Sequence, residues 1–338
     1  MNKSLILTTP GILMSVILAV LSLHISNLMP AHAMGAGVIS LLLGMLFNPL
    51  MTRYPIFLKG LTFTSKKVLK FAIIMMGTSL SFIQVLEVGK YSLVVMTFTL
   101  FAAFGGGYIL GKAFDMDWRL SSLISAGTGI CGASAVAAIA PVIDSEDSQI
   151  AYAISATFIF DVVMVVLFPL MGVYFGMNDL GFGLWTGTAV NDTSSVVAAG
   201  YAFSDAAGNF AVIVKLTRTL AIVPVVLIFS WINSRSKSIG DSLVSTKKVD
   251  ISAIFPWFIP LFLLMVGIKS AGLIPASISL TLSDTSKFLM VMALGSIGLK
   301  TNFSKLAKSG LLPMAHGFLI STLVVIVSFA VQSFLGQI

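Results

Sequence analysis

The stretch "GTGICGASAVAAIAP" at 127–141 lies inside a long apolar segment, yet three glycines and a serine fall in its first half. Glycine is among the least favourable residues in a helix interior. A second stretch, "GTAVNDTSSVVA" at 187–198, aligns without gaps to 127–138. The identical pairs are Gly127/Gly187, Thr128/Thr188, Ser134/Ser194, Val136/Val196 and Ala138/Ala198. Both stretches predict a helix that is interrupted near the middle of an apolar segment.

The composition is that of an integral membrane protein. Hydrophobic residues make up 57% of the 338 residues and charged residues 10%, and the mean hydropathy is +1.02. This leaves too little polar surface to cover a soluble globule. A helix needs about 20 apolar residues to cross about 30 Å of hydrocarbon. Such runs recur at 10–28, 35–51, 66–86, 91–114, 118–143, 148–176, 180–203, 209–235, 256–274, 280–299 and 311–335. We therefore expect an all-α polytopic membrane protein with about eleven hydrophobic segments in a single transmembrane domain, 1–338.

The net charge of +7 is concentrated in the loops. Loops rich in Lys and Arg lie on the cytoplasmic side of a membrane. Four such groups alternate correctly with the segments: Arg53, Lys59, Lys66, Lys67 and Lys70; Lys112 and Arg119; Arg235, Lys237, Lys247 and Lys248; and Lys300, Lys305 and Lys308. They predict an amino terminus inside the cell and a carboxyl terminus outside. They also account for the positive net charge, so no nucleic-acid partner is expected. The polar loop 233–250 is the expected internal boundary. Ala31-His32-Ala33 resembles a cleavage site, but the apolar segment before it is long for a signal peptide, so we expect it to be retained.

Two pairs of similar stretches suggest inverted repeats. "KFAIIMMGTSLSF" begins at Lys70 and "KFLMVMALGSIGLKTNF" at Lys287, and the charge rule makes them run in opposite directions, as inverted repeats require. The interrupted segments 118–143 and 180–203 form the second pair, and such pairs point to the binding site of a transporter. The alternative is that their small residues only permit close helix packing.

The directions of the two interrupted segments are open. If each crosses the membrane fully, they run the same way and are not inverted mates. If each is re-entrant, they enter from opposite sides and the inversion holds. The loop 144–148 contains no Lys or Arg, which favours an external position and therefore full crossing.

Few ionisable residues lie deep inside the segments, and these are candidates for function. Asp161 and Asp192 are the acidic ones, and each is expected to manage coupling to a proton or Na⁺, or alternatively to cap a helix break. Lys215 and Arg218 share a helix face. Arg218 lies roughly 13 Å along its segment from Asn209, so we expect one cation to pair with a buried carboxylate and the other to bind an anion. The alternative is two ion pairs and no ligand.

The breaks offer further groups for an anion, because a half-helix that starts at a break presents N–H groups and the positive end of its dipole. The expected substrate-binding residues are Thr128, Gly129, Gly132 and Ser134 at the first break, Asn191, Thr193 and Ser194 at the second, and Lys215 and Arg218. The single cysteine, Cys131, excludes an internal disulfide. It has no histidine nearby in the sequence, so we expect no enzymatic activity. His316 is a candidate proton-relay residue, with helix packing as the alternative.

The pair "GTGICGASAVAAIAPVI" and "GTAVNDTSSVVAAGYAF", followed by "VKLTRTLAIVPVV", resembles the YeiH-like family of bacterial membrane proteins, which are described as sulfate exporters. That family is similar to sodium/proton antiporters, bile-acid symporters and anion carriers. The resemblance implies inverted repeats, broken helices that cross at the binding site, alternating access and a location in the bacterial inner membrane. Some relatives carry His-Glu where this chain has Asn191-Asp192, so a proton role of that His does not transfer.

We therefore expect a secondary transporter that exports a small anion, such as sulfate or a small organic or sulfonated anion, without ATP hydrolysis. It would need no cofactor or metal beyond a coupling proton or Na⁺. The expected partners are the anion and the lipid bilayer, with a homodimer left open. Alternatives are a cation/proton antiporter, or a membrane subunit of an ion-pumping enzyme complex.

Overall fold

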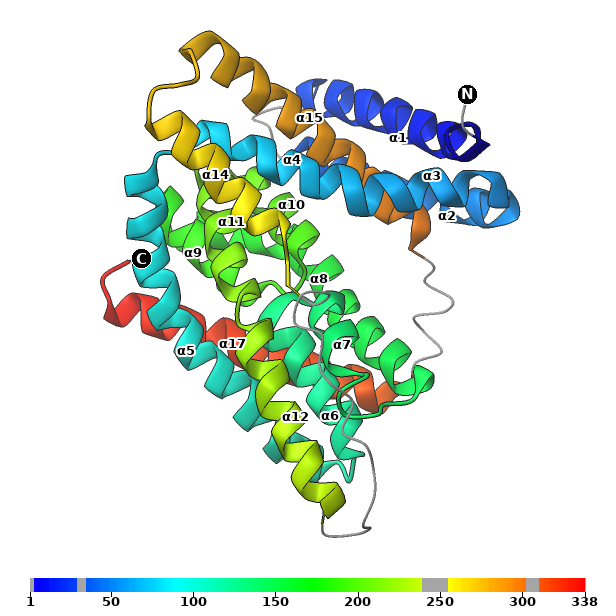
Figure 1. The fold of residues 1–338 in the computed structure, drawn as a ribbon, viewed down its shortest axis with the longest axis vertical. Helices are drawn as coiled ribbons and strands as arrows, with labels where there is room; N and C mark the ends of the chain where they lie inside the picture. Colours follow the sequence, from blue (N-terminus) through cyan, green and yellow to red (C-terminus); the bar gives the residue numbers. More distant parts are fainter. Residues whose placement is uncertain (1–2, 29–34, 239–254, 302–309, 338) are drawn as a thin grey trace.

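The computed structural model describes residues 3–28, 35–238, 255–301 and 310–337, and within these ranges the chain is helical apart from its connecting turns. The helices form two bundles (Figure 1). The first bundle contains α1 (Lys3–Leu28), α2 (Ala36–Arg53), α3 (Leu58–Phe63), α4 (Leu69–Met76), α14 (Phe258–Ser270) and α15 (Ala276–Lys300). The second contains α5 (Phe82–Ala113), α6 (Trp118–Ala126), α7 (Ala133–Ile139), α8 (Asp147–Tyr174), α9 (Asp179–Ala189), α10 (Thr193–Phe203), α11 (Asp205–Thr219), α12 (Ile222–Ser238) and α17 (Leu311–Phe334).

Five helical segments of the described residues are long and apolar enough to cross a membrane: Thr8–Leu28, Phe82–Ala113, Asp147–Tyr174, Asp205–Asn233 and Leu311–Phe334. Ala36–Met51 and Phe258–Ser270 are shorter apolar helices. The all-helical, polytopic character predicted from the sequence is therefore present. The number of eleven crossing segments stays a prediction, as does the boundary at 233–250, which lies mostly outside the described residues.

The predicted limits of two segments were wrong. The apolar pattern predicts separate segments at 66–86 and 91–114, but the helix that includes α4 ends with a 3₁₀ turn at Gly77–Ser79. Ser81 then begins α5 with a capping box, in which its side chain accepts from the Gln84 N–H and the Gln84 side chain accepts from the Ser81 N–H. This local signal outweighs the charged residues Glu87 and Lys90, which α5 accommodates on its exposed side.

The first bundle is held by close backbone contacts and by buried serines. A Cβ on Gly44 would lie 2.5 Å from the carbonyl oxygen of Gly295, so α2 and α15 approach as only glycine permits. Ser286 donates to the carbonyl of Ala72 at 2.7 Å, and Ser279 donates to that of Thr78 at 2.6 Å. These contacts make α4 and α15 antiparallel, as the charge rule predicted for their two "KF" stretches. Their relation as inverted repeats stays a prediction.

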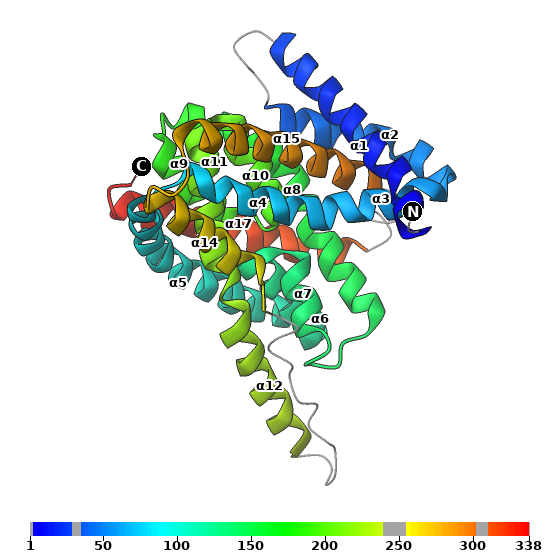
Figure 2. The ribbon, with the colours of Figure 1, turned by 45° about the horizontal axis from the view of Figure 1, so that its top comes forward.

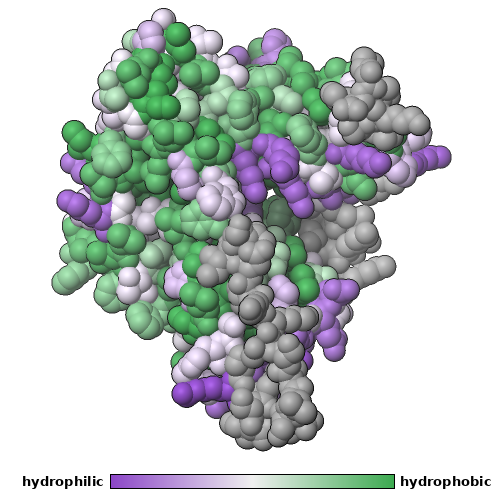
Figure 3. All heavy atoms as spheres, in the orientation of Figure 1, coloured by the Kyte–Doolittle hydropathy of each residue, from purple (hydrophilic) through white to green (hydrophobic). Residues whose placement is uncertain are grey.

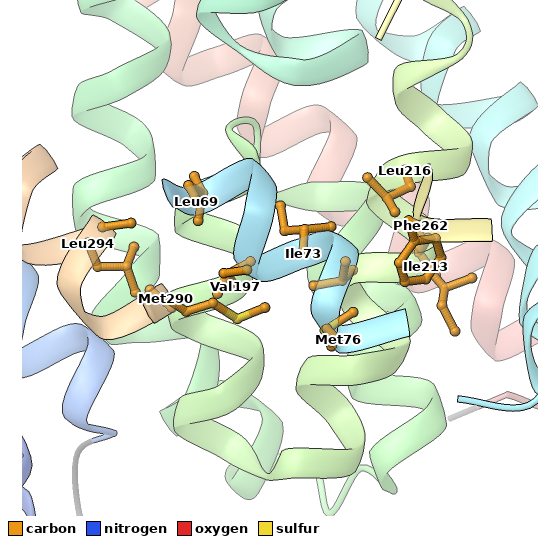
Figure 4. Packing of buried hydrophobic residues seen from close by; sticks show 14 of the residues in the cluster. Leu69, Ile73, Met76, Val197, Ile213, Leu216, Phe262, Met290 and Leu294 are labelled. Carbon is orange, nitrogen blue, oxygen red and sulfur yellow. The ribbon is translucent and has the colours of Figure 1, made fainter. Parts of the chain in front are cut away.

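The two bundles meet across an apolar surface. Figure 2 shows α4 and α15 lying over α8, α10 and α11. Figure 4 shows the packing at this surface, where the labelled side chains are Leu69, Ile73, Met76, Val197, Ile213, Leu216, Phe262, Met290 and Leu294. All of these side chains are buried. Contact between the bundles therefore rests here on close packing and burial of apolar surface.

Candidate functional site

The first interrupted segment is a hairpin. It consists of α6, a π-helical turn at Gly127–Cys131, a reversal at Gly132 and the short helix α7. Gly132 has φ +62°, a conformation that residues with a Cβ rarely adopt. Asp117, which caps α6, also accepts a hydrogen bond of 3.0 Å from the side chain of Gln149 in the first turn of α8. The segment therefore returns to the end of the bundle at which it began.

This arrangement corrects the preference for full crossing drawn from the loop 144–148. Asn233, near the end of α12, donates to the carbonyl of Val142 at 2.9 Å, so that loop lies beside the basic end of α12. α7 has seven residues and is about 10 Å long, which is too short to complete a crossing.

The second interrupted segment is also a hairpin. α9 ends at Ala189, an extended link follows, and α10 begins at Thr193. Ser204, directly after α10, donates to Asp179 in the first turn of α9 at 2.5 Å. This hairpin begins after α8 ends and the first one ends before α8 begins, so the 28 residues of α8 separate their open ends. The two hairpins therefore enter the bundle from opposite ends.

The tips of the two hairpins touch at equivalent positions. A Cβ on Gly132 would lie 3.2 Å from the Cβ of Asp192, and the gapless alignment of 127–138 with 187–198 pairs these residues. We call this contact the crossing. A larger residue at position 132 would separate the two hairpins.

Two cations of α11 bind both hairpins at once. Arg218 donates through its two terminal nitrogens to the carbonyls of Thr128 and Thr188, and through Nε to that of Gly129 at 2.5 Å. Lys215 donates to the carbonyls of Ile130 at 2.9 Å and Val190 at 3.0 Å. Thr128 aligns with Thr188, and Ile130 with Val190. Each cation therefore binds a pair of carbonyls that occupy equivalent positions in the two hairpins. Both cations lie at C-terminal helix ends, where the dipole favours positive charge.

The predicted pairing of one of these cations with a buried carboxylate was wrong. Within the described residues, the salt bridge observed joins Lys287 to Asp205 at 2.6 Å on the surface. The carboxylate of Asp161 instead accepts from the backbone N–H groups of Asn191 at 2.8 Å and Asp192 at 2.7 Å. The cations were free to bind carbonyls because the carboxylates are satisfied by backbone amides. Asp161 therefore has the capping contacts of the structural alternative.

Asp192 differs from Asp161 in its exposure. It is the N-cap of α10 and accepts from the backbone N–H of Ser194 at 2.9 Å and from the Ser194 hydroxyl. Asp161 is completely buried, whereas Asp192 is half-buried. Thr193 is half-buried and Ser134 is exposed. The other predicted residues of the two breaks, Thr128, Gly129, Gly132, Asn191 and Ser194, are buried. The accessible polar groups of the crossing are therefore Ser134, Asp192 and Thr193.

A hollow lies between the two bundles. Figure 3 shows it just below α4, where hydrophilic side chains gather at its rim. Lys66, Lys67 and Lys70 are exposed on α4 and on the π-helical turn before it. These three lysines therefore belong to the elements that lie directly above the hollow in this view.

The sequence missed a contribution from α17. Ser321 lies 3.3 Å from the hydroxyl of Thr128, and Asn191 donates to Ser321 at 3.2 Å. The available signal was the spacing of Ser321, Ser328 and Gln332 along one face of an apolar helix. His316 instead contacts Ser121 at 3.2 Å and packs against Phe114, as the packing alternative predicted.

Comparisons with known proteins match nearly the whole chain. The sequence model of a family described as conserved hypothetical protein 698 matches residues 10–317. A UPF0324 membrane protein of Clostridium tetani is 67% identical over 336 residues, covering 97% of each chain. A UPF0324 membrane protein of Streptococcus pneumoniae serotype 4 is 37% identical, over 96% of this chain and 97% of its own. One of Fusobacterium nucleatum is 35% identical, over 96% and 98%. The resemblance to a family of bacterial membrane proteins is therefore confirmed, while the names of these three relatives do not mention sulfate.

Proposed function

The chain belongs to the conserved hypothetical protein 698 family of membrane proteins, and from this premise we propose that it is a secondary active transporter of a small anion. The substrate class is sulfate or a small organic or sulfonated anion, and export occurs by alternating access. The protein lies in the bacterial inner membrane with its amino terminus inside and its carboxyl terminus outside. It catalyses no reaction, holds no resident cofactor or metal, and is able to form a homodimer.

The observation that carries this proposal is the crossing itself. Two hairpins enter from opposite ends of one bundle and touch at Gly132 and Asp192, and Arg218 and Lys215 tie them together through matched carbonyls. Broken segments that meet inside a bundle place backbone groups and helix ends where a solute can reach them, which is the arrangement used by secondary transporters.

The distribution of charge supports an anion. Arg218 and Lys215 bring two buried positive charges to the crossing, and the first break contains no acidic residue. Ser134 and Thr193 offer accessible hydroxyls, which suit an oxyanion. The exposed lysines beside the hollow, Lys66, Lys67 and Lys70, would attract anions to the cytoplasmic entrance.

Asp192 supports coupling to a proton or Na⁺. It is the accessible carboxylate of the crossing, and its contacts with Ser194 leave acceptor capacity for an ion. Asp161, the other predicted coupling residue, also holds the second break in place through its bonds to the Asn191 and Asp192 N–H groups. The Asp192 carboxylate also supports a second candidate function, a cation/proton antiporter. In that case Asp192 binds the transported ion and no anion moves.

The apolar surface between the bundles supports alternating access. Sliding along a surface such as that in Figure 4 breaks few directional bonds. A rigid second bundle could therefore move against the first while the crossing stays intact.

Reconstitution in liposomes tests the proposal. Labelled sulfate and a pH-sensitive dye are followed together under sodium or potassium gradients. Sulfate flux that is driven by an ion gradient and reduced by Asp192→Asn supports it. The matched control is Asp284→Asn, because Asp284 is exposed on α15. Sodium-driven proton movement without flux of sulfate or a sulfonate would favour the antiporter.

A further inference from the structure

The inner face of α17 carries a row of completely buried polar side chains. Ser321, Ser328 and Gln332 are spaced seven and four residues apart, which places them on one side of the helix. Gln332 lies in the last turn of α17, whereas Ser321 lies beside the crossing. The row therefore leads from one end of the bundle to its middle.

The row consists of two hydrogen-bonded groups. In the outer group, Gln332 donates to Ser328 at 3.0 Å, and the hydroxyls of Ser328 and Thr188 lie 2.5 Å apart. In the inner group, Ser321 contacts Asn191 at 3.2 Å and Thr128 at 3.3 Å. The gap between the groups lies between Thr188 and Asn191, which are only three residues apart in the chain.

Two buried amide oxygens within the described residues have no hydrogen-bond partner, and both belong to this row. Oδ1 of Asn191 lies beside the gap, and Oε1 of Gln332 lies at the outer end. The hydroxyl of Thr186, on α9, also has no partner. Buried polar groups are nearly always paired, either with protein or with ordered water.

Helix packing alone does not explain this pattern. Serine and threonine hydroxyls commonly join membrane helices, and the bonds from Ser328 to Thr188 and from Ser321 to Thr128 do so. Packing gives no reason to leave amide oxygens unpaired at the gap and at the outer end. Water at the gap would join the two groups into one continuous chain, and water on Gln332 would extend this chain to the end of α17.

We propose that this row is a hydrated proton path from the outer end of α17 to the buried carboxylate of Asp161. The assignment deepens the proposed function by making the coupling ion a proton. The proton enters at the water on Gln332 and passes along water and hydroxyl groups to Asn191. It then binds a carboxylate oxygen of Asp161, and the amides of Gln332 and Asn191 position the water.

Arrival of the proton would change the second hairpin. Asp161 accepts from the N–H groups of Asn191 and Asp192, and a protonated carboxyl accepts these bonds less strongly. The titratable groups that face Asp161 are Asp192 at the break and Lys215 and Arg218 on α11. Protonation loosens the cap of α10 and couples the proton to movement at the crossing.

Radiolytic labelling tests the water without requiring transport. Hydroxyl radicals formed from bound water oxidise adjacent side chains. The reporter is Trp185, whose side chain is 1% exposed. Its indole N–H donates to the carbonyl of Val325, which lies on α17 between Ser321 of the inner group and Ser328 of the outer group. We expect oxidation of Trp185 in the wild type and a fall of about tenfold in Ser328→Ala and Thr188→Val, which remove row hydroxyls. An unoxidised Trp185 in the wild type overturns the proposal.

Proton flux in liposomes tests the path. Ser328→Ala and Thr188→Val should slow proton movement about tenfold while equilibrium binding of labelled sulfate stays unchanged. The control is Ser22→Ala, because Ser22 is equally buried but bonds to a carbonyl of its own helix in the first bundle. Wild-type proton rates in both row variants overturn the path. If sulfate flux occurs without proton movement, the proposed transport function holds and the proton path is rejected. If proton flux depends on the row but no anion moves, the proton path holds and the anion transporter is rejected.

Discussion

Arg218 shows how one buried residue can organise two hairpins. Its guanidinium group donates to carbonyl oxygens at the C-terminal helix ends of both hairpins. Removing the side chain therefore leaves these buried carbonyl oxygens without donors. Hydrogen bonds from charged groups contribute about 1.5–3 kcal/mol each, so we expect Arg218→Ala to lower the free energy of unfolding by about 3 kcal/mol or more. Thermal unfolding in detergent measures this loss. The control is Arg53→Ala, because Arg53 is exposed, and equal stability of the two variants would contradict the capping role.

Gly132 supplies a second prediction at this scale. Its φ is +62°, and an added Cβ would press on Asp192. We expect Gly132→Ala to destabilise the protein by about 1–3 kcal/mol and to reduce transport by separating the hairpins. Gly105→Ala on α5 is the matched control, since a Cβ there meets nothing within 4 Å. Thermal unfolding that is unchanged by Gly132→Ala would mean that the crossing tolerates a side chain.

At the scale of elements, the return of the first hairpin makes a topological prediction. Cysteines introduced at Lys112 and Ser148, in a Cys131→Ala background, should react with a membrane-impermeant maleimide from the same side. A cysteine at Ser333 should react from the opposite side. All three positions are exposed. Reaction of position 148 together with 333 would restore full crossing, and Cys131→Ala alone should leave transport largely intact.

The sequence predicted the breaks well because glycine and polar residues are unfavourable inside an apolar membrane helix unless the helix is interrupted there. Positions 127–134 and 187–195 both contain a break, and their gapless alignment matches the carbonyls shared by Arg218 and Lys215. The direction of the first hairpin was not predictable, because it depends on long-range contacts such as Asp117 with Gln149. The hydrogen-bond acceptors of Arg218 and Lys215 were not predicted, because every residue has a backbone carbonyl and the residue type does not show which one binds a cation. The α17 row was missed because isolated serines in an apolar helix resemble packing residues.

At the scale of the whole molecule, the ion pair between Asp205 on α11 and Lys287 on α15 bridges the two bundles. If the bundles move against each other, a short thiol-reactive cross-linker between cysteines at these positions should reduce transport about tenfold or more. Liposome flux before and after linking measures this. The control is the same cross-link between cysteines at positions 117 and 149, which both lie in the second bundle. This cross-link should leave transport intact. Full transport by the linked 205–287 protein would show that the bundles stay fixed.

The sharing of Arg218 between the two hairpins also constrains how the chain is made. Thr128 and Arg218 are 90 residues apart, so the first hairpin leaves the ribosome well before its cation does. Until α11 arrives, the carbonyls of that hairpin have no donor inside the hydrocarbon, where unpaired backbone groups are costly. We therefore expect the first hairpin to stay shielded from the hydrocarbon until α11 is inserted. Both hairpins reach their final form only when the synthesis of α11 is complete.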